Sequence, residues 1–145
     1  MPDTGSRAQE IRDSMAASAF HTWMGIQVVE VRDGEVDLAI ETTDHHANLG
    51  GTLHGGVIAT LADTAAGLAA RSVIAPGSSH VTVNLDVQYL RAGGNGRVTA
   101  SGRVTRAGRS IVFAEAEVRD AEQDVLARAQ VTVALLPPKD GTLST

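Results

Sequence analysis

Residues 81–135 alternate almost strictly between apolar and polar side chains. Val81, Val83 and Leu85 begin one apolar face, Val98 and Ala100 another, and the pattern continues through residues 109–119 and 125–135. Glycine-bearing turns separate these segments. Strict alternation with short turns is typical of antiparallel strands that have one face in the core and one in water. On this pattern Thr82 falls on the wet face of its strand.

Two shorter alternating runs precede this region. Residues 26–31 and 35–41 flank an Arg-Asp-Gly tripeptide, which predicts a β-hairpin. Residues 7–20 have apolar side chains at helical spacing, so we expect a helix there. We expect Phe20, Trp23 and Met24 to form an apolar clamp against the core.

Residues 55–70 predict one helix of unusual composition. The segment has no lysine, arginine or glutamate, and Asp63 is its single charged residue. A helix that is apolar nearly all round is a buried one. Its larger apolar residues share one flank, whereas the flank around Asp63 consists of glycine and alanine. A buried carboxylate costs several kcal/mol unless a partner compensates it, so we look for chemistry on this flank.

The predicted elements favour one architecture. The chain has 145 residues, enough for a single domain with a real core, and we expect residues 1–6 and 138–145 to be flexible tails. Half-buried strands must curl their dry face around the apolar helix. We therefore predict an α+β fold in which a curved antiparallel sheet wraps one central helix. The small-residue flank would stay poorly covered in one protomer, which predicts at least a homodimer.

Composition excludes several classes of protein. The net charge is −5 and the chain has only four aromatic residues, so it lacks the basic surface that nucleic-acid binding requires. No apolar run reaches the roughly 18 residues of a membrane helix. The absence of cysteine excludes disulfides and fits a cytoplasmic location. The N-terminus lacks the separate basic and apolar regions of a signal peptide.

One short stretch resembles a known family signature. Asn48, then His54-Gly55-Gly56, then Leu61-Ala62-Asp63 is similar to the motif of hotdog-fold acyl-CoA thioesterases of the phenylacetate-pathway (PaaI-like) type. The His-Phe-Pro-Gly stretch of the hydroxyacyl dehydratases, the other large hotdog group, is absent. The resemblance implies hydrolysis of an acyl-CoA to a free acid and CoA by a dimer or a dimer of dimers, without cofactor or metal. Thr82 matches a position where the family often has a hydroxyl that orients water.

The motif is also chemically sensible. Thioester hydrolysis needs an oxyanion site, a positioned water, and a carboxylate that acts as base or nucleophile. Gly55 at a helix N-terminus offers an N–H group with the positive end of the helix dipole behind it. Asp63 lies about 12 Å further along the axis, so it must serve the site of a neighbouring subunit. Asn48 can hold the water or the carbonyl, and His54 can hydrogen-bond near the reacting group.

Each of these residues also has a purely structural interpretation. Asp63 could form an interface ion pair, Asn48 could stabilise a turn beside Gly50 and Gly51, and His54 could simply precede the helix. Gly55 and Gly56 could serve close packing. Two adjacent histidines, His45 and His46, with His54 nearby and no thiol make a poor metal site, so we expect none.

The CoA phosphates require cationic partners. Arg91 stands beside the 93–96 turn, and Arg106 and Arg109 flank Gly108 at the next turn. Guanidinium groups with free backbone N–H groups bind phosphate well, and the family often has nucleotide contacts in these two loops. Solvated arginines at strand ends are an equally good interpretation.

A second function from another class stays open at this point. A hotdog protein without catalysis could bind acyl-CoA or an acyl carrier protein. The joint presence of Asn48, Gly55 and Asp63 favours the thioesterase. The resemblance to the phenylacetate-pathway type implies an aryl- or medium-chain acyl-CoA as its substrate.

Overall fold

The structure is a computed structural model that describes residues 4–138; the tails expected at residues 1–3 and 139–145 lie outside the described residues. Residues 4–6, expected to be loose, already belong to the first helix. The elements follow in the order α1 (Thr4–Ala17), α2 (Ala19–Met24), β1 (Gln27–Arg32), β2 (Glu35–Glu41), the 3-10 turn η1 (Asp44–His46), α3 (Gly55–Arg71), β3 (Ser79–Tyr89), β4 (Arg97–Ala107), β5 (Ile111–Arg119) and β6 (Val125–Leu136).

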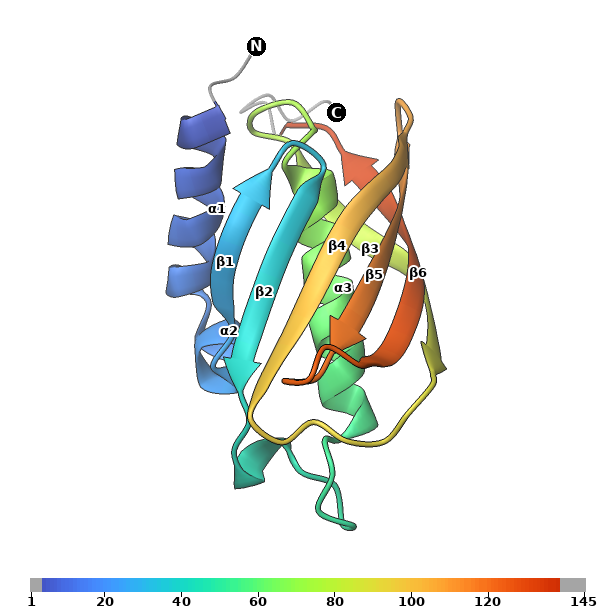
Figure 1. Cartoon of the computed structure of the whole chain (residues 1–145). Helices are drawn as coiled ribbons and strands as arrows, with labels where there is room; N and C mark the ends of the chain where they lie inside the picture. The colour runs from blue at the N-terminus through green and yellow to red at the C-terminus, as the bar shows by residue number, and fades with distance from the viewer. Residues whose placement is uncertain (1–3, 139–145) are drawn as a thin grey trace, which may run out of the picture.

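The predicted architecture is confirmed. A six-stranded sheet in the order β1-β2-β4-β5-β6-β3, antiparallel throughout, curves around α3 (Figure 1). α1 lies beside β1, and β3 forms the opposite edge of the sheet (Figure 1). No helix within residues 4–138 is long and apolar enough to cross a membrane. The result is the hotdog fold.

The N-terminal helix differs from its prediction. The expected helix over residues 7–20 is divided, because the Ser18 hydroxyl accepts a hydrogen bond from the backbone N–H of His21 and caps a new helix, α2. The predicted clamp is only partly correct. Met24 is buried, but the side chains of Phe20 and Trp23 are 52% and 69% exposed.

A β-bulge in β3 overturns the predicted orientation of Thr82. The register of β3 against β6 shifts between Thr82 and Asn84, so Val83 is the extra residue. Thr82 pairs with Val133 and Leu85 pairs with Val131, and both valines are buried. Thr82 therefore faces α3 together with Leu85. Strict alternation placed it on the wet face, because alternation cannot reveal an inserted residue.

The helix α3 lies very close to β4. A Cβ atom on Gly102 would stand 2.2 Å from the carbonyl oxygen of Ala65 and 2.6 Å from the backbone nitrogen of Ala66. Only glycine permits this approach, because a real Cβ would overlap the helix backbone. The facing surface of α3 is correspondingly small and fully buried at Ala62, Ala65 and Ala69.

Replacing Gly102 with alanine should therefore destabilise the protein severely. The new methyl group must push α3 off the sheet, which we expect to lower the free energy of unfolding by at least about 2 kcal/mol. Thermal unfolding followed by circular dichroism should show this as a large fall in Tm. Ser101→Ala, on the exposed face of the same strand, is the control. Equal Tm values for the two variants would contradict the close contact.

Candidate active site

Asp63 and Thr82 meet on the flank of α3 that faces β3. The Thr82 hydroxyl donates a 2.7 Å hydrogen bond to Oδ1 of Asp63, and both residues are half-buried. Among the described residues Asp63 forms no ion pair. The hydroxyl fixes one carboxylate oxygen and leaves the other available.

Two histidines outside the predicted site, His21 and His80, lie near this carboxylate. His80 on β3 packs against Gly67, where a Cβ would stand 3.2 Å from its Nε2. Burial lowers the pKa of His80, Arg71 lowers it further, and Asp63 opposes both effects. Burial likewise lowers the pKa of His21 against the opposing charge of Asp63. Both lowered pKa values favour neutral rings beside Asp63 near pH 7.

The N-terminus of α3 uses its two glycines differently. Nδ1 of His54 accepts a 2.8 Å hydrogen bond from the N–H of Gly56, so His54 is the N-cap of the helix. A neutral His54 with Nδ1 as acceptor carries its proton on Nε2. The N–H of Gly55 makes no hydrogen bond within residues 4–138. One donor at the positive end of the helix dipole is thus left for another acceptor.

Tyr89 covers the first residue of the helix. Its hydroxyl donates a 2.7 Å hydrogen bond to the carbonyl oxygen of Gly55, and its ring atoms lie 3.4 Å from where a Cβ of Gly55 would be. The sequence motif does not include Tyr89, which follows the alternating strand pattern of residues 81–89. Its phenolic hydroxyl, a polar group on a largely apolar side chain, was the available signal.

Asn48 holds its own loop together. Its Oδ1 accepts hydrogen bonds from the N–H groups of Gly50 and Thr52, and its Nδ2 donates to Oγ1 of Thr52. These contacts fit the turn-stabilising interpretation. One hydrogen of Nδ2 is left without a bond among the described residues.

The other loop histidines have structural surroundings. His46 is buried, accepts from the N–H of Thr43 at Nδ1, and lies with Nε2 2.8 Å from the carbonyl oxygen of Met24. It therefore ties the loop to the end of α2. His45 is exposed. No group of three or more potential metal-ligating side chains gathers in the described part of the chain.

The arginines expected to bind CoA lie at opposite ends of α3. Arg91 is near the N-terminal end, because the N–H of Leu53 donates a hydrogen bond to the carbonyl oxygen of Gly93 in the adjoining turn. Arg91 also forms a 2.7 Å ion pair with Asp124. Arg109, with Gly108, lines a shallow pocket shared with Val73 and Ile74 at the C-terminal end. Arg106 and Arg109 form no ion pair or side-chain hydrogen bond within the described residues. One protomer does not bring the three arginines together.

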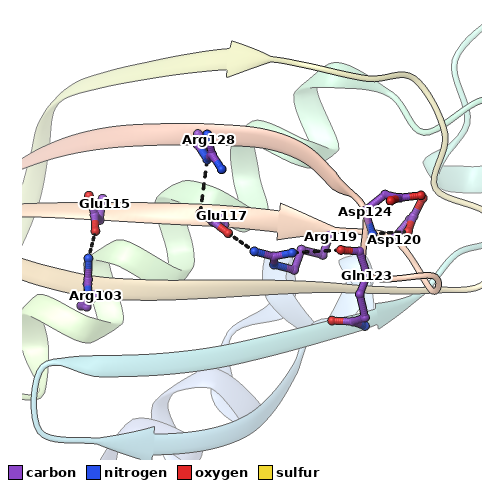
Figure 2. Close-up of polar contacts among 8 residues, drawn as sticks. All are labelled: Arg103, Glu115, Glu117, Arg119, Asp120, Gln123, Asp124 and Arg128. Carbon is purple, nitrogen blue, oxygen red and sulfur yellow. Dashed lines mark hydrogen bonds and ion pairs between the residues drawn. The ribbon is translucent and has the colours of Figure 1, made fainter.

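A large hollow in the described chain contains none of the predicted site residues. It has a volume of about 940 Å³ and lies against the outer face of the sheet. Charged side chains in ion pairs line it, including Arg103 with Glu115 and Arg128 with Glu117 (Figure 2). Burial would raise the pKa of Glu117, but its contacts with Arg119 and Arg128 outweigh this and lower the pKa. Such a neutralised surface offers neither an apolar acyl pocket nor an oxyanion site.

Asp63 and Gly55 are not joined in one chain. They are eight residues apart on one helix, which is about 12 Å along its axis. The structure therefore presents two candidate half-sites: a carboxylate fixed by a hydroxyl, and a helix N-terminus with an unused N–H group.

The comparisons with known proteins agree with this fold. Residues 50–127, which include α3 and the strands β3, β4 and β5, match the thioesterase superfamily. The chain belongs to the thioesterase superfamily, with the hotdog fold, and is a thioester hydrolase.

Three similar proteins illustrate the relationship. A predicted esterase of Halobacterium salinarum is 39% identical over 102 residues, which cover 67% of each chain. The 1,4-dihydroxy-2-naphthoyl-CoA hydrolase of Listeria monocytogenes is 29% identical over 112 residues, covering 77% of this chain and 91% of that protein. The PaaI protein from the phenylacetic acid degradation operon of Escherichia coli has a TM-score of 0.85 at 22% identity, covering 94% and 99% of the two chains. This last likeness shows the shared fold.

Proposed function

We propose that this protein hydrolyses an aryl- or medium-chain acyl-CoA to the free acid and CoA, at a site built from two copies of the chain. The observation that carries the proposal is the pair of separated half-sites on one helix. Asp63 and Thr82 supply the carboxylate of one site, and Gly55 of a second subunit supplies its oxyanion donor. The thioesterase family to which the chain belongs fits this chemistry.

The exposed edge of the sheet supports a dimer. β3 is an edge strand, and Val81, Val83 and Leu85 are exposed along it. A long apolar edge strand is a ready template for pairing with another chain. Pairing β3 with its copy about a twofold axis would set two α3 helices antiparallel, with Asp63 of each chain towards the N-terminal half of the other. A further association of two dimers into a tetramer is compatible with this arrangement.

The proposed chemistry assigns a role to each group. The thioester carbonyl oxygen accepts a hydrogen bond from the N–H of Gly55, where the helix dipole stabilises the negative charge of the tetrahedral intermediate. His54 offers its Nε2–H as a second donor beside it. The Thr82 hydroxyl orients Asp63, and Asn48 shapes the loop that leads to the helix.

Two routes to the products fit the free oxygen of Asp63. In the first, Asp63 takes a proton from water, the hydroxide adds to the carbonyl carbon, and the C–S bond breaks to release the CoA thiolate, which is then protonated. In the second, the carboxylate itself attacks and the thiolate leaves. Water then adds to the Asp63 carbonyl of the resulting anhydride, and the acid leaves with one of the original Asp63 oxygens. Single-turnover hydrolysis in ¹⁸O-labelled water distinguishes the routes, because only the second puts label into Asp63.

In the proposed dimer, arginines from both subunits can lie near the same active site. Antiparallel α3 helices bring the β4–β5 turn of one subunit, with Arg106, Gly108 and Arg109, towards the Gly55 end of the other. Arg106 and Arg109 are the better phosphate ligands, because Asp124 already neutralises Arg91. An aromatic acyl group is supported by the relative named for its naphthoyl-CoA substrate. A cytoplasmic location stays a prediction from the absence of cysteine.

The first test removes the charge of Asp63. Asp63→Asn keeps the size of the side chain and an acceptor for Thr82, so the fold should survive while kcat on benzoyl-CoA or hexanoyl-CoA falls by about 10²–10⁴. Thiol release measured with a chromogenic reagent gives the rate. Asp86→Asn is the control. Asp86 is an exposed carboxylate on β3, paired with Gln130 of β6, and its variant should keep wild-type turnover. Near wild-type turnover in Asp63→Asn would exclude Asp63 from the reaction.

The second test removes the Gly55 N–H group alone. Proline suits the first position of a helix and lacks the N–H, so Gly55→Pro should fold yet lose about 10²–10³ in kcat. Gly55→Ala retains the N–H, and its Cβ would make an ordinary contact with Tyr89. We expect the alanine variant to be far more active than the proline variant. Equal activities of the two, with intact circular dichroism, would rule out the N–H as the oxyanion donor.

A further inference from the structure

The protein places no aromatic side chain in its described core. Its four aromatic residues are all about half exposed or more: Phe20, Trp23, Tyr89 and Phe113. Aromatic side chains normally supply much of the buried apolar area of a domain. Exposed aromatic residues that gather in one place therefore point to a ligand or partner. Two of the four, Phe20 and Trp23, share the six-residue helix α2.

The helix α2 is held firmly, so its exposed aromatic residues are not the result of a loose segment. Ser18 caps its first turn, and Gly25 in the left-handed conformation ends it. Met24 is buried, and His46 contacts the carbonyl oxygen of Met24 at 2.8 Å. The rings of Phe20 and Trp23 thus extend from a fixed platform.

This platform lies beside the proposed catalytic carboxylate. Nε2 of His21 approaches Oγ1 of Thr64, the residue after Asp63, at 3.5 Å, and the charge of Asp63 acts on the His21 ring. The ring of Phe20 packs edge-on against His21, with ring centroids 5.4 Å apart. A continuous series of contacts therefore leads from Phe20 through His21 to the helix turn that carries Asp63.

The surface along the contacts from Phe20 to Asp63 has few charged residues, so it favours an uncharged ligand group. Residues 14–29, which include all of α2, contain no aspartate, glutamate, lysine or arginine. The facing helix has Asp63 as its single charge over residues 55–70. Arg12 and Arg71 reach the edges of this segment, but they are already bonded to the Val28 and Val29 carbonyls and to Ser14. An apolar acyl chain or ring would bury surface against the two aromatic side chains.

We propose that Phe20 and Trp23 form a wall of the acyl subsite and determine specificity for aromatic and medium-chain acyl groups over acetyl. The inference rests on the proposed thioesterase function, because it assumes that the acyl group lies next to Asp63. Tyr89 stays at the Gly55 end of the helix, where it contacts the backbone.

The test compares acyl selectivity across a panel of substrates. Wild type, Phe20→Ala, Trp23→Ala and the control Phe113→Ala are assayed with acetyl-, hexanoyl-, benzoyl- and phenylacetyl-CoA. Loss of one large apolar contact should lower kcat/KM for the three larger thioesters by about tenfold, and acetyl-CoA should be hydrolysed at an unchanged rate. Phe113 is equally exposed but lies on β5, so its variant should keep the wild-type selectivity.

Trp23 provides a direct binding signal, because it is the single tryptophan of the chain. Titration of the Asp63→Asn variant with phenacyl-CoA, a thioether that cannot be hydrolysed, should shift the tryptophan fluorescence saturably. CoA alone, which lacks the acyl group, should leave the emission unchanged.

Three outcomes would overturn the inference. The Phe20 and Trp23 variants could keep wild-type selectivity, could lose all four activities equally, or could change the oligomeric state in gel filtration while selectivity is retained. The last result would assign this aromatic surface to a contact between copies of the chain. Failure of the proposed function itself is distinguishable, because wild-type protein would then release no thiol from any thioester in the panel.

Discussion

The structure depends on how closely α3 approaches the sheet. Gly102 has no side chain, and the carbonyl of Ala65 occupies the space where a Cβ would be. With alanine on the facing helix surface, the backbone of α3 rests almost directly on β4. The position of α3 then follows from steric exclusion, which is a stiffer constraint than contact between long flexible side chains. Asp63, on another flank of the same helix, is therefore held at a fixed distance from the sheet.

The bulge in β3 completes this arrangement. An extra residue, Val83, turns Thr82 inward while Leu85 keeps its inward position. Without the bulge one of these two side chains would face water. The hydroxyl reaches Asp63 for this reason, and the same edge strand leaves the apolar side chains of Val81 and Val83 exposed. In the proposed dimer, the strand that orients Asp63 is therefore also the strand that pairs with the second chain.

Much of the fold could be predicted from the sequence, because α3 and the strands carry strong periodic signals over long segments. The local failures have specific physical causes. Ser18 divides the N-terminal helix through a cap that periodicity does not register. Phe20 and Trp23 look like core residues by hydrophobicity alone, yet they are exposed. The engagement of Asn48 within its own loop depends on backbone geometry that residue spacing does not encode.

The central claim is that each site takes Asp63 from one chain and Gly55 from the other, and mixed dimers test it most directly. Asp63→Asn and Gly55→Pro chains carrying different affinity tags are co-expressed, and assemblies that contain both tags are isolated. Each variant alone should be nearly inactive. A mixed dimer regains one intact site, so we expect about half of the wild-type activity per dimer. Doubly tagged assemblies as inactive as either parent would contradict the account, since both groups would then act within one chain.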